Sequence, residues 1–204
     1  MDHQSVTLRR ANPTFDEGLA FARYLDEAAE GFFRFMLGPR AGNIIATAFA
    51  LPDHDLSYQN ATFAEREEAI VGMVSGYTAD QHGRSSLQPL IQAAGRRNPR
   101  MSIVRGLFAP LLRLIDSIED GDFYLQTIAV DEGERGNGLG AILLDSFERH
   151  ARDEGATRLA LDVSAGNQGA VRFYERHGMT IESQWPKRLK IPGLKLYRMV
   201  KSLE

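Results

Sequence analysis

The sequence predicts one α/β domain with a central sheet flanked by helices. The clearest evidence follows Gly121, where apolar strand-like segments alternate with amphipathic helical segments. A helix between two strands is typical of the crossover that joins parallel neighbours in a sheet. The chain has 204 residues, 43% of them hydrophobic and 25% charged, which is ordinary for a globular protein with a packed core.

The front of the chain predicts a short strand and then three helices. Thr14 is placed to begin the first helix, because Asp16 and Glu17 follow it in the first turn. Glycines and prolines then separate the next apolar stretches. The expected elements are a strand over residues 6–10, a helix starting at residue 14, and helices over residues 32–37 and 41–51.

A β-hairpin is predicted next, followed by a segment of mixed character. Residues 57–64 and 70–77 both have strand patterns, and the charged residues between them form the turn. Prolines and glycines then interrupt stretches with helical spacing. Four apolar residues there share one helical face: Leu107, Leu111, Leu114 and Ile118. We therefore expect a helical insertion at about residues 79–120 within a single domain that covers residues 1–204.

The remaining chain predicts the order strand, helix, strand, helix, strand, strand. The expected positions are residues 123–130, 139–154, 158–163, 168–177, 180–185 and 194–201.

Composition and charge argue against several classes of function. The chain has 24 basic and 27 acidic residues and a net charge of -3, so neither nucleic acid nor an anionic membrane is an expected partner. Its longest apolar run, residues 44–51, is too short to span a bilayer. The first fifteen residues carry no apolar secretory segment, and we expect a cytoplasmic protein. With no cysteine and no metal-binding spacing among its five histidines, the chain predicts no metal site.

A glycine-rich turn between an apolar strand and a long amphipathic helix carries the strongest chemical signal. Glycines at 136, 138 and 140 let a ligand approach the backbone closely. The amides of the first helical turn have no partner within the helix, so they suit an anion such as pyrophosphate. Arg135 adds a permanent positive charge. A turn that only tightens the connection between strand and helix would show the same glycines.

The same turn also satisfies a dinucleotide-binding pattern. Gly136, Gly138 and Ala141 match G-x-G-x-x-G/A, and the acidic Asp162 lies on the next expected strand. In dinucleotide-binding folds, however, the first glycine follows its strand directly, whereas residues 131–135 intervene here. The pattern therefore leaves NAD as a disfavoured ligand.

Three linked motifs resemble the GNAT superfamily of acetyl-CoA-dependent N-acyltransferases. Arg135 to Gly140 fits the family signature Q/R-x-x-G-x-G/A and follows a strand that ends at Val130. Leu161-Asp162-Val163 looks like the fifth strand of the family. Asn167 is similar to the asparagine that follows that strand in the family, and residues 170–179 to the tyrosine-bearing helix after it. The close match covers about residues 123–180, and the front elements agree in order. The resemblance implies a mixed, mainly antiparallel sheet that is splayed between its fourth and fifth strands.

The resemblance also implies where acetyl-CoA binds. Backbone groups of Ile128 and Val130 would pair with the pantetheine arm like an added strand. Asn167 would contact the cofactor arm, and its position equally suits a helix N-cap. The backbone amides expected to hold the CoA pyrophosphate are those of Arg135, Gly136, Asn137, Gly138, Leu139, Gly140 and Ala141.

Two residues are implied as catalytic groups by the resemblance. Tyr174 is the candidate general acid for the departing CoA thiolate, because a phenol of pKa about 10 is protonated at neutral pH. Helical spacing alone would place Tyr174 in the core beside Phe173. Asp162 aligns with the general base of some protein N-terminal acetyltransferases, and a structural carboxylate is the alternative. Glu132 and Glu134 depart from the family pattern, and we expect both to point away from the phosphate site.

Together these features predict an N-acetyltransferase that moves an acetyl group from acetyl-CoA to a primary amine. Direct attack in a ternary complex is expected, because no cysteine is available for an acyl-enzyme. The alternatives are a non-catalytic acyl-CoA-binding module and, less favoured, an NAD-dependent oxidoreductase. The acceptor site is expected between residues about 27–56, the hairpin and the loop at 186–193, and the insertion's apolar stripe would also suit a homodimer. Acidic residues that would attract a cationic amine there are Glu27, Glu30, Asp53 and Asp55.

Overall fold

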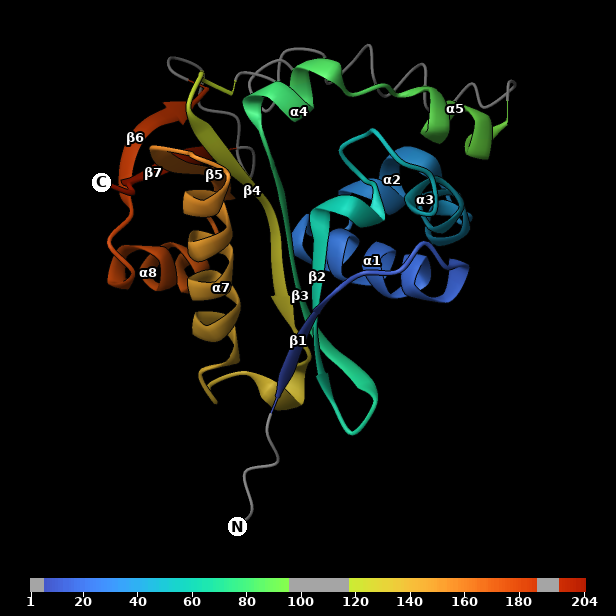
Figure 1. Ribbon diagram of the computed structural model, residues 1–204, viewed down its shortest axis with the longest axis horizontal. Coiled ribbons are helices and arrows are strands. Elements are labelled where there is room, and N and C mark those ends of the chain that lie inside the picture. The colour runs from blue at the N-terminus through green and yellow to red at the C-terminus, as the bar shows by residue number, and fades with distance from the viewer. Residues whose placement is uncertain (1–5, 96–117, 187–194) are drawn as a thin grey trace.

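A computed structural model describes residues 6–95, 118–186 and 195–204. Its strands are β1 (Thr7–Arg10), β2 (Ala61–Arg66), β3 (Ala69–Thr78), β4 (Asp122–Val130), β5 (Arg158–Ser164), β6 (Thr180–Trp185) and β7 (Leu196–Ser202). They form one seven-stranded sheet in the order β1-β2-β3-β4-β5-β7-β6 (Figure 1). Among the described pairs, β4 and β5 are parallel and the others antiparallel. The predicted mixed, mainly antiparallel sheet is therefore confirmed.

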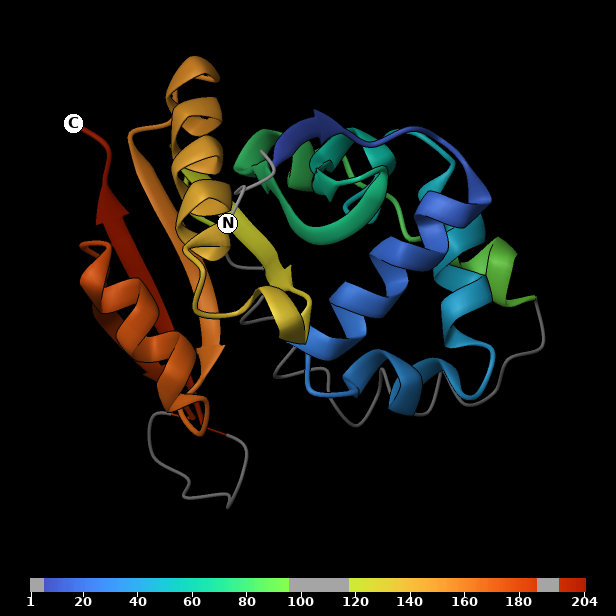
Figure 2. The same ribbon diagram turned by 90° about the horizontal axis from the view of Figure 1, so that it is seen from below.

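Helices cover both faces of this sheet. They are α1 (Phe15–Ala28), α2 (Phe32–Leu37), α3 (Ala41–Phe49), α4 (Ala79–Arg84), α5 (Gln88–Ala94), α7 (Leu139–Asp153) and α8 (Gln168–Arg176). Seen from below, α1 and α7 lie on opposite sides of β4 (Figure 2). Across residues 6–95, 118–186 and 195–204, none of the helices combines the length and apolarity that a membrane span requires.

Local signals explain most of the element boundaries. The side chain of Thr14 accepts a hydrogen bond from the amide of Glu17 at 3.3 Å and so caps α1, as the sequence predicts. Strand β2 begins at Ala61 rather than at the predicted residue 57, because residues 58–60 form a 3-10 turn first. The predicted insertion contains α4 and α5, whereas Leu107, Leu111 and Leu114 lie outside the described residues.

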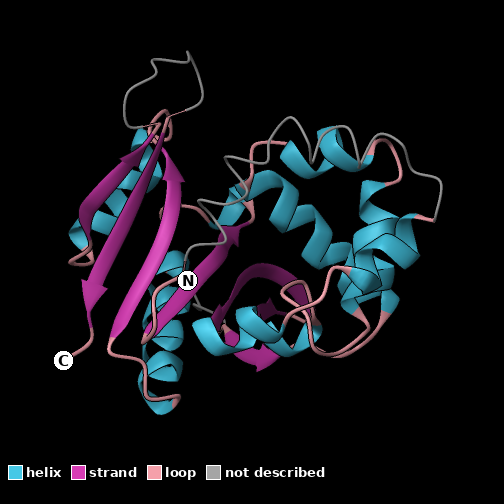
Figure 3. Cartoon of the chain, turned by 90° about the horizontal axis from the view of Figure 1, so that it is seen from above, coloured by secondary structure: helices cyan, strands magenta, loops and turns pink. Residues whose placement is uncertain are grey.

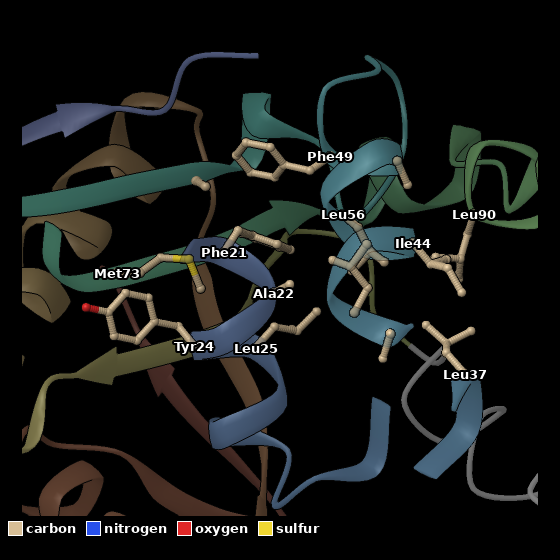
Figure 4. Close-up of a cluster of buried hydrophobic side chains, with 14 of the residues drawn as sticks. Phe21, Ala22, Tyr24, Leu25, Leu37, Ile44, Phe49, Leu56, Met73 and Leu90 are labelled. Atoms are coloured by element: carbon tan, nitrogen blue, oxygen red, sulfur yellow. The ribbon is translucent and has the colours of Figure 1, made fainter. Parts of the chain in front are cut away.

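The core has one layer on each face of the sheet. On the face of α1, Phe21 packs 4.8 Å from the ring of Phe49, and Met73 of β3 lies beside them (Figure 4). On the other face, α7 and α8 bury Phe123 and Leu125 of β4. Because successive strand residues point to opposite faces, Tyr124 lies on the face of α1.

The sheet opens between β4 and β5. These strands pair only from Asp122 to Tyr124 on β4, opposite residues 158–160 of β5. In Figure 3 the strands at one side of the molecule fan away from the rest of the sheet. Strand β4 also contains a bulge, because Ser75 faces Thr127 and Gly76 faces Leu125, which leaves Gln126 as the extra residue. The predicted splay between the fourth and fifth strands is confirmed.

Candidate active site at the splayed strands

The glycine-rich turn between β4 and α7 is open at the backbone. Gly136 and Gly138 have φ values of 82° and 83°, a left-handed conformation that favours glycine. A Cβ atom at either position would meet nothing within 4 Å, so these glycines are not required by packing. In the part of the chain that the structure describes, no side chain caps α7 at Leu139. The first-turn amides, which lack intrahelical partners, are therefore placed to bind an anion.

The turn is tied to α1 by three polar contacts. Asp131 accepts a hydrogen bond from the hydroxyl of Tyr24 at 2.8 Å and pairs with Arg23 at 2.7 Å. Arg135, whose charge is expected beside the anion, pairs with Glu27 of α1. Both side chains of that pair are about half exposed, so a bound anion can compete with Glu27 for Arg135.

The two acids that depart from the family pattern also precede this turn. Glu134 pairs with Arg66 of the hairpin at 3.1 Å, so its carboxylate is directed at the hairpin and its charge is compensated. Glu132 lies in a single 3-10 turn over residues 132–134 and is exposed.

The outer part of β4 has an open edge. Ile128 and Val130 pair with Val74 and Gly72 on β3, but in the described structure the strand has no pairing with β5 beyond Tyr124. Backbone groups along this edge are therefore available to an extended ligand, which would add to the sheet as a strand does. The edge leads directly into the glycine-rich turn, so the predicted positions for pantetheine and pyrophosphate are continuous.

Asn167 and Tyr174 lie at the α8 side of the opening. The side chain of Asn167 accepts a hydrogen bond from the amide of Ala170 at 3.1 Å, which makes Asn167 the N-cap of α8. Tyr174 is buried and packs edge-on against Phe173, with ring centroids 5.3 Å apart. Burial raises the pKa of the Tyr174 phenol well above its ordinary value, so the hydroxyl keeps its proton at neutral pH.

Asp162 forms a buried ion pair on the face of the sheet opposite α7 and α8. Its two carboxylate oxygens accept hydrogen bonds from Nε and Nη2 of Arg198, each at 2.8 Å. The hydroxyl of Tyr124 donates to the same carboxylate at 3.1 Å. Burial raises the pKa of Tyr124 well above its ordinary value, and the charge of Asp162 adds to that effect.

Sequence reasoning missed a group of residues that continues from Tyr124. Tyr77 lies opposite Tyr124 on β3, and the two ring centroids are 5.7 Å apart. His82 of α4 stacks on Tyr77 at 5.5 Å with an interplanar angle of 11°. Nδ1 of His82 lies 2.9 Å from a carboxylate oxygen of Asp55. Thr78 and Gln81, which form a capping box, are a signal that could have located the start of α4, but nothing in the sequence links this helix to Asp55.

The other acids proposed to attract an amine are divided between two places. Glu27 and Glu30 line a cavity of about 530 Å³ between α1, α2 and α3. Asp55 pairs with His82 of α4, and the backbone of Asp53 adopts a left-handed conformation nearby in sequence. Most of the expected loop at 186–193 lies outside the described residues.

Known proteins share this architecture. The Acetyltransferase (GNAT) family matches residues 25–179 of the chain. Acetyltransferase Atu2258 of Agrobacterium fabrum is 32% identical over 117 residues, which cover 57% of this chain and 77% of that protein. A solved structure described as the crystal structure of acetyltransferase has a TM-score of 0.67 at 26% identity and covers 97% of this chain and 100% of its own.

A second solved structure shares the fold at lower identity. The N-acetyltransferase from Staphylococcus aureus Mu50 has a TM-score of 0.66 at 16% identity, over 95% of this chain and 99% of its own. Since the family match spans most of the chain and includes the splayed strands and the glycine-rich turn, this protein belongs to the acetyltransferase (GNAT) family.

Proposed function

We propose that the protein transfers the acetyl group of acetyl-CoA to a primary amine by direct attack within a ternary complex. Membership of the GNAT family implies acetyl-CoA as the donor. The observation that carries the proposal is the open edge of β4 beyond Tyr124, which continues into the uncapped, glycine-rich start of α7. An extended arm that ends in a pyrophosphate matches both features.

The proposed cofactor contacts follow from this edge. Backbone groups of Ile128 and Val130 bind the pantetheine arm, and the amides of residues 135–141 bind the pyrophosphate. Asn167 fixes the start of α8 and thereby the position of the cofactor arm beside it. Gly136 and Gly138 leave open space where a side chain would block the phosphates.

Direct transfer is supported by the absence of cysteine, and the protonated phenol of Tyr174 is the candidate acid for this step. With no cysteine in the chain, the amine attacks the thioester carbonyl itself. The C–S bond then breaks, and the thiolate takes a proton from the Tyr174 hydroxyl. The proton that the newly acylated nitrogen loses restores the phenol. Burial keeps this phenol protonated at neutral pH, so the hydroxyl carries the proton that the leaving thiolate takes.

Asp162 was predicted to be the general base, and that role remains a prediction. The ion pair argues against it, because a proton on Asp162 would cancel the negative charge that pairs with the buried Arg198. Asp162 also accepts a hydrogen bond from the hydroxyl of Tyr124, which lies in the last residue pair between β4 and β5. This contact favours a structural role for Asp162 at the point where the two strands part.

Ligand-dependent unfolding and turnover test the proposed function. We expect saturating acetyl-CoA to raise the melting temperature by roughly 5 to 10 °C, since a ligand at about 100 times its Kd stabilises by about 2.7 kcal/mol. Parallel samples with CoA, with NAD and without ligand serve as controls. A panel of primary amines should then give steady release of CoA thiol. Stabilisation without turnover would instead favour a non-catalytic acyl-CoA-binding module, and a response to NAD alone would contradict the donor.

A further inference from the structure

We propose that a cavity between the edge of the sheet and the C-terminal half of α7 binds a small phosphate monoester. The cavity has a volume of about 280 Å³, and its walls come from β1, β2 and residues 146–153 of α7. The glycine-rich turn precedes α7, which begins at Leu139. The cavity is therefore a site distinct from the one proposed for acetyl-CoA.

Cross-strand pairing brings one arginine to this cavity. Arg10 of β1 lies opposite Thr62 of β2, and Thr62 lies opposite Val74 of β3. Directly paired residues point to the same face of a sheet. Val74 is buried in the core layer beneath α7, so Arg10 and Thr62 point to that face as well. Both therefore line the wall of the cavity that the sheet provides.

Helical spacing brings further polar groups to the opposite wall. Ser146, Arg149, His150 and Asp153 follow one another on α7 within three or four residues, so they share one face of the helix. Nη2 of Arg10 lies 3.3 Å from Nε2 of His150. The sheet wall and the helix wall meet at this contact.

Two arginines of the cavity have guanidinium groups that no acid neutralises. Within the described part of the chain, Arg10 contacts His150, and Arg149 donates to the carbonyl oxygen of Asp145, but neither forms an ion pair. Arg9, a third arginine of the lining, is by contrast held by two glutamates at 3.2 and 2.6 Å. Two positive charges of the cavity are thus available to an anion.

A phosphate monoester matches these groups. It carries about 1.5 to 2 negative charges at pH 7 and has three strong acceptor oxygens. The planar fork of an arginine binds phosphate through two parallel hydrogen bonds. Thr62 and Ser146 add hydroxyl donors, and Asn60 adds an amide donor. A carboxylate, with one charge and two oxygens, would match fewer of these donors.

The size of the cavity limits the organic part of the ligand. A volume of about 280 Å³ lies below the range of typical drug-sized sites, so only a small group fits beside the phosphate. The buried side chains of Val74 and Phe147 form an apolar floor for that group.

One carboxylate in the lining opposes an anion. Asp153 lies in the last turn of α7 and is exposed. Because water screens an exposed charge, this carboxylate offsets the two guanidinium groups only in part. Removing it should therefore strengthen binding, which a cavity without an anion site would not show.

His150 reports on the charge in the cavity. Partial burial lowers the pKa of His150, and the positive charge of Arg10 lowers it further. The carboxylates of Asp153 and Glu154 act in the opposite direction. Arg149 is the other charged group that α7 places at the cavity. A bound phosphate would offset the charge of Arg10 and so raise the pKa of His150.

Titration with phenyl phosphate at constant ionic strength tests the proposal. Inorganic phosphate, sulfate and acetate are the comparison ligands. The protein is first saturated with CoA, so that the glycine-rich turn is occupied. We expect phenyl phosphate to have the lowest Kd of the four ligands. In NMR spectra its binding should raise the pKa of His150, whose signal is assigned by its loss in His150→Gln.

Variants locate the bound anion. Arg10→Gln and Arg149→Gln should each raise the Kd of phenyl phosphate about 5- to 10-fold. Asp153→Asn should lower it about 2- to 5-fold. Arg40→Gln, which removes an exposed arginine outside the cavity, is the matched control and should leave the Kd unchanged. Melting temperatures without ligand check that all four variants are folded.

Several results would overturn the proposal. No measurable binding of phenyl phosphate would do so, and so would an unchanged Kd in both Arg10→Gln and Arg149→Gln. Displacement of phenyl phosphate by CoA would place the anion at the glycine-rich turn instead. A Kd for phenyl phosphate no lower than that for sulfate would contradict a phosphate monoester as the ligand.

The outcome does not depend on acetyl transfer. A wild type that binds no CoA is titrated without it, and the two arginine variants then decide. The proposed function can therefore fail while this site is confirmed, and the site can fail in an active acetyltransferase.

Discussion

Asp162 on β5 and Arg198 on β7 face each other across the sheet and form a bidentate ion pair, with both N···O distances at 2.8 Å. Their side chains are only 4% and 6% exposed, so water does little to screen either charge. The pair also fixes Tyr124, whose hydroxyl donates to Asp162 at 3.1 Å. It therefore links β5 and β7 to β4, the strand with the open edge.

Breaking this pair on one side should be costly. We expect Arg198→Met to lower the free energy of unfolding by about 3–5 kcal/mol, because it leaves the Asp162 carboxylate buried without its partner. Replacing both residues, with Asp162→Leu and Arg198→Met, should recover most of that loss. Urea unfolding measures both variants.

The control for this prediction is a pair at the surface, Arg34 and Asp26, whose side chains are 73% and 17% exposed. Arg34→Met should change the free energy of unfolding by less than about 1 kcal/mol. A double variant at 162 and 198 that is as unstable as the single one would show that packing, rather than the unpaired charge, causes the loss.

The sequence was most informative where a local rule decides the structure. Thr14 caps α1 as predicted, and Phe32–Leu37 forms α2 between glycines with positive φ. The splay followed from the resemblance of residues 123–180 to a known family, because no local pattern records how far two strands stay paired. The sequence placed the start of β2 too early. The 3-10 turn before the strand has residues of mixed polarity, and a strand pattern looks the same.

The polar groups at the opening depend on contacts between distant parts of the chain. His82 and Asp55 are 27 residues apart and meet only because α4 folds back over the loop before β2. Asp162 was recognised by its place on a strand, but its partner Arg198 lies 36 residues away on β7. The sequence can suggest that an acidic residue on a strand is a base. Only the fold shows which groups, such as Arg198, already donate hydrogen bonds to its carboxylate.

Gly76 allows β3 and β4 to approach closely beside the opening. A Cβ atom there would lie 2.2 Å from the carbonyl oxygen of Tyr124 and 2.3 Å from the ring of Phe147. We expect Gly76→Ala to lower the free energy of unfolding by about 1–3 kcal/mol and to reduce turnover, because it displaces the strand that carries Tyr124. Gly133→Ala, with nothing within 4 Å of its added methyl group, should change stability by less than about 1 kcal/mol. Equal melting temperatures for the two variants would contradict the steric argument.

Tyr174→Phe tests the proposed acid. The variant keeps the ring that packs on Phe173 but removes the hydroxyl, so kcat should fall about 100-fold or more while the Kd of acetyl-CoA changes little. Burial raises the pKa of the Tyr174 phenol, so the group stays protonated to a higher pH than an ordinary tyrosine. Wild-type kcat should therefore show no loss from tyrosine ionisation up to about pH 10.

Tyr58→Phe, which removes a hydroxyl from a ring that packs on Phe49, is the matched control and should keep the wild-type kcat. If Tyr174→Phe does so too, the thiolate receives its proton from another donor.

Glu27 pairs with Arg135, and we expect it to compete with the cofactor for that guanidinium. In Glu27→Gln the guanidinium of Arg135 no longer has an anionic partner on α1, so we expect acetyl-CoA to bind about 2- to 5-fold more tightly. This range corresponds to the free energy of an exposed ion pair, which is at most about 1 kcal/mol. Arg135→Gln should weaken binding instead. Glu30→Gln, which removes a neighbouring charge in the same cavity, is the matched control and should leave the Kd nearly unchanged. Calorimetric titrations at low and high salt measure the effect, which should shrink as salt screens the charges. If Glu27→Gln bound acetyl-CoA no more tightly than Glu30→Gln at low salt, Arg135 would not contribute its charge to the pyrophosphate site.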